Sequence, residues 1–151
     1  MRAVIQRVAR SSVSVDGAIV SETGRGFMVL LGITEGDGEK DIAYICDKLL
    51  NVRVFPDDNY KMNLSLSDIG GDILIVSQFT LYADARNGRR PDYALAAKGD
   101  IARPVYESVV TRLKESYVPD RIKTGVFGAM MEVSLVNEGP VTILLDSNKT
   151  F

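Results

Sequence analysis

The stretch MEVSLVNEGPVTILLDS, residues 131–147, alternates apolar and polar residues on both sides of a Gly-Pro pair. Its apolar positions are Met131, Val133, Leu135, Val141, Ile143 and Leu145. Alternation with period two predicts two half-buried strands. Proline cannot donate to a sheet, and glycine adds no side chain to pack. Spacing alone therefore favours an ordinary turn at Gly139-Pro140 between two strands, with backbone offered to a ligand as the alternative.

Strand patterns also occur in most of the chain outside this stretch. Residues 2–10 and 52–55 are predicted strands, and residues 27–33 and 72–81 are apolar runs typical of buried strands. Val13 and Val15 alternate before Asp16-Gly17, a pair that favours a hairpin turn. These runs predict a strand-rich core, either β-barrel-like or a strongly curved sheet.

Two segments change to a helical period. The apolar face of the first is Ile42, Ile45, Cys46 and Leu49, and that of the second is Ile101, Val105, Val109 and Leu113. Asp37 or Asp41 is a candidate cap for the first helix. Pro104 is expected in the first turn of the second helix, where proline is tolerated. Strands at irregular spacing with only two main amphipathic helices predict an α+β fold, as a single compact domain over residues 1–151.

Composition excludes several kinds of catalytic site. The chain has no histidine, so a Ser-His-Asp triad or a histidine metal site is impossible. Its single cysteine, Cys46, cannot form an internal disulfide or a thiolate zinc site, and it suits a reducing cytoplasm. We expect no metal and no cofactor. The N-terminal segment is charged, and its apolar run is too short for a signal peptide. No apolar run in the sequence is long enough to span a membrane.

Polar residues follow the predicted strand at 72–81. Ser77, Gln78, Phe79 and Thr80 would lie at its end, where hydroxyls and an amide can line a pocket. The alternative is that these groups only satisfy nearby backbone. A threonine without a visible base is a poor nucleophile, so the four residues on their own favour that alternative.

Two further segments have both a structural and a functional interpretation. Phe127 and Met131 flank glycine and alanine, and a nucleobase could stack on the phenylalanine while the methionine adapts to it. Core packing is the commoner role for such residues. Between residues 84 and 98 the chain concentrates positive charge in a polar loop, which is either solvated or contacts phosphates. Its basic residues are Arg86, Arg89, Arg90 and Lys98.

Taken together, the motifs SQFTLYAD (77–84) and NEGPVT (137–142) resemble the D-aminoacyl-tRNA deacylase family. The segments MRAVIQRV, GRGFMVLLGI, GGDILIVSQFTLYAD and TGVFGAMMEVSLVNEGPVTILLDS are also similar to family sequence, in family order. The resemblance covers nearly the whole chain. It implies a homodimer with active sites at the subunit interface, and hydrolysis of the ester between a D-amino acid and the 3′-terminal adenosine of tRNA. It also implies removal of mischarged glycine.

The resemblance assigns roles to particular positions. Gly139 and Pro140 would be a cis pair that enters the partner subunit's pocket, where their carbonyl oxygens exclude an L side chain. Arg7 would orient that pair. Phe127 and Met131 would hold the terminal adenine.

Ser77, Gln78, Phe79 and Thr80 would line the reaction centre, and two mechanisms are open there. Either the Thr80 hydroxyl attacks the ester, or the 2′-hydroxyl of the adenosine activates water while backbone amides near Gln78 and Phe79 stabilise the oxyanion. Since the chain offers no evident base, we favour the second. Where many family members carry Ser-Phe after GRRP, this chain has Asp92-Tyr93, so contacts of that loop are open.

Two other functions remain as alternatives to this activity. One is a tRNA 3′-end-binding module without catalysis, and the other is an esterase acting on small D-amino acid esters.

Overall fold

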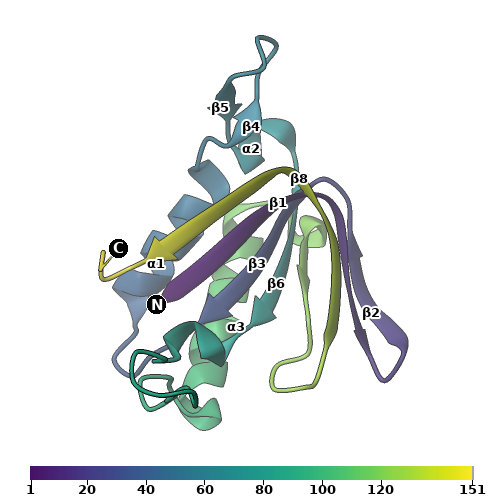
Figure 1. The fold of residues 1–151 in the computed structure, drawn as a ribbon. Helices are drawn as coiled ribbons and strands as arrows, with labels where there is room; N and C mark the ends of the chain where they lie inside the picture. The colour runs from purple at the N-terminus through teal and green to yellow at the C-terminus, as the bar shows by residue number, and fades with distance from the viewer. Residues whose placement is uncertain (151) are drawn as a thin grey trace.

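A curved, six-stranded mixed sheet with two long helices on one face makes up most of the structure (Figure 1). The structure is a computed structural model that describes residues 1–150. The strands of the sheet are β1 (Arg2–Val15), β2 (Ala18–Thr23), β3 (Gly26–Gly32), β6 (Asp72–Ser77), β7 (Ile122–Thr124) and β8 (Glu132–Asp146). They run in the order β2-β1-β3-β6-β7, and β8 pairs with the remaining edge of β1. The predicted α+β fold with a strongly curved, strand-rich sheet is confirmed.

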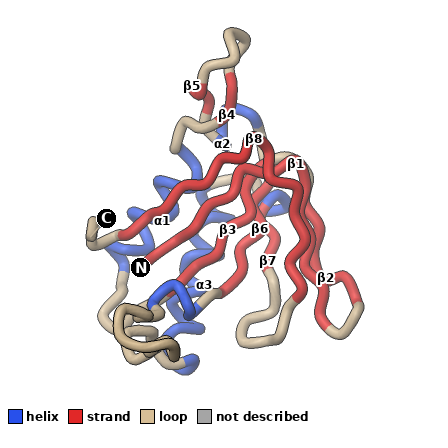
Figure 2. Tube along the Cα trace, in the orientation of Figure 1, coloured by secondary structure: helices blue, strands red, loops and turns tan. Residues whose placement is uncertain are grey.

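The remaining elements cover one face of the sheet or extend from its end. They are α1 (Glu39–Asn51), α2 (Leu66–Ile69), α3 (Gly99–Ser116), the 3-10 helices η1 (Phe79–Tyr82) and η2 (Pro119–Arg121), and a small hairpin of β4 (Phe55–Pro56) and β5 (Met62–Leu64). Figure 2 shows the strands in front of α1 and α3, with the β4–β5 hairpin projecting beyond the sheet. No helix within residues 1–150 is long and apolar enough to cross a membrane.

Apolar side chains gather on both faces of the sheet. On the helix side, residues such as Ile5, Phe27 and Ile75 pack with Ile45 of α1 and Val109 of α3. The opposite face has a smaller cluster of Val8, Val13, Met28, Leu74 and Val76, over which the sheet curls. Residues of β3 alternate between these two clusters, which explains its unbroken apolar run, because apolar side chains pack on both of its faces.

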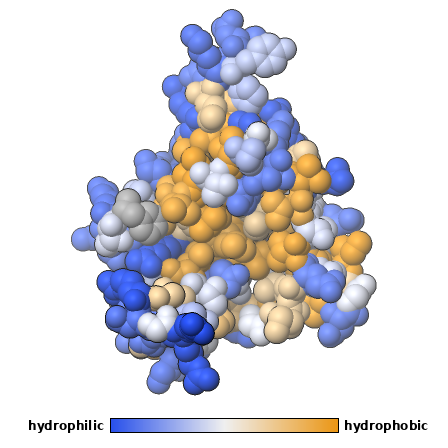
Figure 3. Space-filling model, in the orientation of Figure 1, coloured by the Kyte–Doolittle hydropathy of each residue, from blue (hydrophilic) through white to orange (hydrophobic). Residues whose placement is uncertain are grey.

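The open face of the sheet keeps an apolar row in contact with solvent. Val4 of β1 lies opposite Leu144 of β8 on one side and Leu30 of β3 on the other. Leu144 is 57% exposed. Figure 3 shows an apolar area across the middle of this face, ringed by polar residues.

The predicted turn at Gly139-Pro140 is wrong. One continuous strand, β8, runs through both halves of the stretch and pairs with β1 throughout. Val8 pairs with Asn137 and Gln6 with Thr142, so four residues of β8 face the single residue Arg7. The Gly-Pro pair is therefore accommodated as a bulge, which lets the strand bend without ending.

Other predicted elements differ in detail. β6 ends at Ser77, earlier than expected, and the chain turns into η1 at Phe79. The helix starting at residue 39 has Gly38 as its N-cap, and the Asp41 carboxylate accepts a hydrogen bond from the Gly38 N–H. Asp16 and Gly17 both have positive φ, as the predicted hairpin turn requires.

The buried face of α3 differs in part from the predicted one. Its buried residues are Ala102, Tyr106, Val109 and Leu113, whereas Ile101 is 42% exposed. Pro104 lies within α3, in its second turn, because the helix begins at Gly99. Ile101 was wrongly assigned to the buried face, whereas Val105 packs against the core as predicted, and the pattern missed the buried Tyr106.

Candidate active site

A cavity of about 640 Å³ opens at the carboxyl end of β6. Its wall comes from β3, β6, the loop before α3, the first turn of α3 and the loop before β8. The lining residues are Leu31, Ile33, Val76, Ser77, Gln78, Phe79, Tyr93, Ala96, Ala97, Gly99, Ala102, Phe127, Gly128, Ala129, Met130, Met131 and Val133. The cavity brings together two of the predicted groups, residues 77–79 and the pair Phe127 and Met131. The wall is mostly apolar, with its polar atoms concentrated where β6 ends, as ligand pockets commonly are.

The turn after β6 fixes the polar end of the cavity. The Gln78 N–H donates to the Leu31 carbonyl, 2.8 Å away, so this backbone amide is already used by the sheet. Phe79 begins η1, and the N–H of a first helical residue has no acceptor inside the helix. The Gln78 side-chain amide donates to the Thr80 hydroxyl over 2.6 Å. Thr80 is exposed and does not line the cavity, so of the four predicted residues it lies furthest from the wall.

Phe127 packs against an aromatic ring, and a cation lies over its own ring. Its ring centroid lies 5.4 Å from that of Tyr106, and the Arg103 guanidinium lies 5.0 Å from its centroid. The Tyr106 hydroxyl donates to the Ile75 carbonyl, which anchors this support to β6. The ring on the cavity wall is therefore fixed by packing and is available to stack on a planar group.

Met131 packs against Gly125, where the lack of a side chain leaves room for its sulfur. A Cβ at Gly125 would lie 2.6 Å from the Met131 sulfur, and the Gly125 N–H donates to the Ile75 carbonyl. The absence of a side chain at residue 125 lets the methionine lie against the strand end. Sequence reasoning missed Gly125, because only a three-dimensional contact reveals its role.

The loop before α3 forms another part of the wall. Tyr93 lines the cavity and packs edge-on against Phe79, with ring centroids 5.2 Å apart. The Ala97 N–H donates to the Ile33 carbonyl and the Thr34 hydroxyl to the Leu95 carbonyl, which fastens the loop to the sheet. Of the loop residues named here, the sequence drew attention only to Tyr93, and only as a departure from the family pattern.

The bulge in β8 is held by arginines. The Gly139-Pro140 peptide bond is cis. Arg7, buried under the bulge, donates from Nε to the Glu138 carbonyl over 3.0 Å and from the guanidinium nitrogen Nη1 to the Val54 carbonyl. The Glu138 carboxylate lies 3.7 Å from Arg7 Nε and 3.5 Å from Arg25 Nε. The predicted link between Arg7 and the Gly-Pro segment is therefore present through Glu138, next to Gly139.

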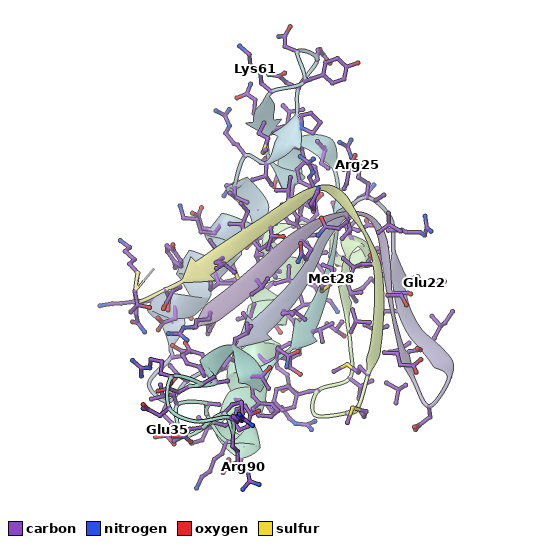
Figure 4. The ribbon with its side chains drawn as sticks, viewed as in Figure 1. Glu22, Arg25, Met28, Glu35, Lys61 and Arg90 are labelled. Carbon is purple, nitrogen blue, oxygen red and sulfur yellow. The ribbon has the colours of Figure 1, made fainter. Side chains whose placement is uncertain are left out.

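Arg25 is a second arginine at the bulge, which sequence reasoning missed. Its guanidinium lies 5.5 Å from the centroid of the Phe55 ring, and its backbone carbonyl accepts from the Asp72 N–H. The side chain points toward the bend of β8 (Figure 4). In the sequence it lies in a Gly-Arg-Gly turn before β3, with no pattern linking it to residue 138.

Within one chain, the bulge and the cavity are far apart. Arg7 pairs with Phe27 and Phe27 with Ile73, whereas Ser77 pairs with Leu31. The two levels are four residues apart on both β3 and β6, or about 13 Å at the rise of a strand. In Figure 1 the bend of β8 lies at one end of the sheet and the turn after β6 at the other. The structure thus does not bring Gly139 and Pro140 to the predicted reaction centre of their own chain.

Asp84 and Cys46 have strongly shifted pKa values, and neither residue lines the cavity. Residues 1–150 contain no cluster of three or more cysteine or acidic side chains able to hold a metal ion. Hydrogen bonds from the Arg86 side chain and backbone hold the pKa of Asp84 far below its usual range. Burial raises the pKa of the Cys46 thiol to about 11, and the thiol lies under α3 as the predicted core residue. Neither group can serve as a base for an ester at neutral pH.

Comparison with known proteins identifies the family of this chain. Residues 4–146 match the family model described as D-Tyr-tRNA(Tyr) deacylase. A D-aminoacyl-tRNA deacylase of Thermosipho africanus is 54% identical over 151 residues, and one of Clostridioides difficile is 52% identical, each covering 100% of both chains. The chain therefore belongs to the D-Tyr-tRNA(Tyr) deacylase family, a family of hydrolases.

Solved structures agree with the fold. The structure of a c-Myc DNA unwinding element binding protein is 45% identical, with a TM-score of 0.93 over 97% of this chain and 98% of that chain. A probable eukaryotic D-amino acid tRNA deacylase, 20% identical, has a TM-score of 0.79 over 95% of this chain and 97% of that chain. The second likeness is one of fold alone.

Proposed function

We propose that this protein hydrolyses the ester bond between a D-amino acid, or mischarged glycine, and the 3′-terminal adenosine of tRNA. The observation that carries the proposal is the cavity at the end of β6, where Phe127 and Met131 face the polar turn at residues 77–79. Family membership over residues 4–146 supports the same activity. Because tRNA is charged in the cytoplasm, the proposal places the protein there.

In this proposal the terminal adenine stacks on Phe127. The ring is braced by Tyr106 and lies on the cavity wall, and stacking of a base on an aromatic ring contributes about 1–3 kcal/mol. Met131 adapts its thioether to the other edge of the base. The ester would then lie toward Ser77 and Phe79, at the polar end of the same cavity.

We propose that a substrate hydroxyl supplies the base. The 2′-hydroxyl of the adenosine accepts a proton from a water molecule as the water oxygen attacks the ester carbonyl. The bond from the carbonyl carbon to the 3′-oxygen breaks, and the 2′-hydroxyl passes a proton to that oxygen, which leaves as the 3′-hydroxyl while the amino acid is released as the free acid. The Phe79 N–H is the candidate oxyanion donor, since the Gln78 N–H is bound to Leu31. Thr80 is a weaker candidate nucleophile because its hydroxyl lies outside the cavity wall and receives the Gln78 amide.

Rejection of L-amino acids would come from the bulge of a second copy. The carbonyl oxygens of Gly139 and Pro140 would occupy the space that an L side chain needs, so chirality is read by steric exclusion. Glycine has no side chain to exclude and would pass. Arg7 supports this role because its guanidinium holds the backbone at Glu138, one residue before the pair.

A homodimer would complete the site. The bulge lies about 13 Å along the strands from the cavity of its own chain. The apolar row of Leu144, Val4 and Leu30 on the open sheet face offers a surface for a second copy, with Leu144 exposed and the other two partly buried. Most small oligomers are two-fold symmetric, and such a dimer would contain two equivalent sites.

Hydrolysis of D-Tyr-, Gly- and L-Tyr-tRNA, measured side by side with equal enzyme, tests the proposed function. The expected result is cleavage of the D-Tyr and Gly substrates and survival of the L-Tyr substrate. Binding of tRNA without release of the amino acid would establish instead a module for the tRNA end. Cleavage of small D-amino acid esters that free tRNA does not inhibit would establish a general esterase.

A further inference from the structure

A basic loop tip stands beside the cavity mouth. The N–H of Asp84 donates to the Asp92 carbonyl and the N–H of Asp92 to the Asp84 carbonyl, which closes residues 85–91 into a projecting tip. Arg89 and Arg90 lie on this tip, and both are exposed. Figure 4 shows Arg90 at the end of the molecule opposite Arg25. Tyr93, which follows the tip along the chain, lines the cavity.

Two of the three arginines of the tip, Arg89 and Arg90, form no ion pair within the described residues. Arg86 is neutralised by Asp84, its terminal nitrogen lying 2.6 Å from the carboxylate. Among residues 1–150, no carboxylate lies within ion-pair distance of Arg89 or Arg90. In a chain of net charge −2, two unpaired guanidinium groups side by side form a local site for an anion.

The loop segment that follows the tip has an aromatic side chain and a basic side chain at or beside the cavity wall. Tyr93 is 41% exposed while its ring packs edge-on against Phe79, so part of the ring faces solvent at the mouth. Lys98 is exposed between Ala97 and Gly99, both of which line the cavity. A stacking surface interleaved with cations is the usual construction of a site for single-stranded nucleic acid.

We propose that the loop 84–98 is the docking surface for the unpaired 3′ strand of the tRNA, with Tyr93 stacking on the base before the terminal adenosine and Arg89, Arg90 and Lys98 binding its phosphates. This rests on the proposed function, because the terminal adenosine in the cavity sets where the strand leaves. A guanidinium binds phosphate oxygens through two parallel hydrogen bonds, which suits arginine for the two positions at the tip. Phosphate contacts of this kind would fix the register of the strand without reading its sequence.

Equilibrium binding of uncharged tRNA over a series of salt concentrations tests the phosphate contacts without relying on turnover. The double variant Arg89→Gln/Arg90→Gln is expected to weaken binding about tenfold at low salt and to reduce the slope of log affinity against log salt by between about one and two. The control Lys114→Gln removes one positive charge from the exposed surface of α3, about 22 Å along the helix from Gly99. It is expected to bind as wild type does.

An unchanged affinity and slope in the double variant would overturn the proposal, as would an equal loss in Lys114→Gln. Failure of the proposed function looks different, since tRNA would bind and no D-aminoacyl ester would be cleaved. For Tyr93, the probes are adenosine monophosphate and a cytidine-cytidine-adenosine trinucleotide. Tyr93→Ala is expected to lose most of the trinucleotide's advantage in affinity, about tenfold, and Tyr93→Phe to keep it. Equal affinity of wild type for the two probes would remove Tyr93 from the docking surface.

Discussion

The cavity at the end of β6 is lined mainly by side chains, whereas the bulge in β8 presents backbone atoms. The cavity is walled by side chains, among them Phe127, Met131 and Tyr93, and only its turn at residues 77–79 contributes polar backbone. The bulge presents backbone, supported from below by the guanidinium of Arg7. In the proposed function, the side chains of the cavity bind the adenosine and the backbone of the bulge excludes one enantiomer, so the two regions would act together.

The largest effect is expected from a charge placed in the cavity. Phe127→Asp removes the stacking ring and places a carboxylate in an apolar wall, so kcat/KM for D-Tyr-tRNA is expected to fall about 100-fold or more. Phe127→Tyr is the matched control and is expected to stay within about fivefold of wild type, because it keeps the ring. Comparable activity of Phe127→Asp and wild type would remove the adenosine from this cavity.

A smaller effect, in selectivity, is expected at the bulge. Arg7→Leu leaves the Glu138 and Val54 carbonyls without their donor, at a cost of about 2–4 kcal/mol in the free energy of unfolding. With the bulge loosened, hydrolysis of L-Tyr-tRNA is expected to rise about tenfold relative to D-Tyr-tRNA. A variant that loses D and L activity in equal proportion would contradict a role of Arg7 in chirality.

The single thiol reports whether Arg7→Leu remains folded. Burial raises the pKa of Cys46 to about 11, so the folded chain holds the thiol protonated and covered at pH 8. The folded variant is therefore expected to react with a thiol reagent as slowly as wild type, and to react fast only after unfolding. Because the folded pKa is raised, Cys46 favours the folded state below the pKa of the unfolded thiol. That contribution is lost as pH rises toward 11.

A few-fold effect is expected from the glycine behind Met131. Gly125→Ala places a Cβ 2.6 Å from the Met131 sulfur, and the flexible thioether must move into the cavity to make room. The KM for D-Tyr-tRNA is expected to rise about fivefold, with kcat within about twofold of wild type, because the change affects the adenine and not the ester. A fall in kcat with unchanged KM would place Met131 at the reaction centre instead.

The smallest effect is expected from Thr80→Ala. Since the Thr80 hydroxyl lies outside the cavity wall, turnover of D-Tyr-tRNA is expected to stay within about threefold of wild type. Single-turnover hydrolysis measures this step directly. A loss of several orders of magnitude would establish the threonine as nucleophile and would sink the mechanism that uses the 2′-hydroxyl.

The comparison of the two regions also shows which structural features could be predicted from the sequence alone. Period-two alternation predicted the strands on both sides of Gly139-Pro140 correctly, but it could not distinguish a turn from a bulge. That distinction depends on β1, where Arg7 alone faces four residues of β8. A register between strands more than a hundred residues apart leaves no trace in local spacing.

The candidate site was likewise predicted in part. The motif at residues 77–80 and the pair Phe127 and Met131 were singled out, and the structure brings all but Thr80 to one cavity wall. Gly125 and Arg25 were missed, because each acts through a partner distant in sequence. The helix face was misplaced only at Ile101, since Val105, Val109 and Leu113 pack in the core as predicted. Tyr106, which packs against β6, was missed.

The central claim is that cavity and bulge act together across two chains, and a mixed dimer tests it most directly. One chain carries Phe127→Asp and Arg7→Leu, and the other is wild type; two different tags allow the mixed dimer to be isolated after co-expression. The account predicts that the mixed dimer cleaves L-Tyr-tRNA although neither parent dimer does, because the intact cavity then meets the loosened bulge of its partner. A mixed dimer that spares L-Tyr-tRNA as wild type does would show that each cavity is guarded by its own chain, and would contradict the account.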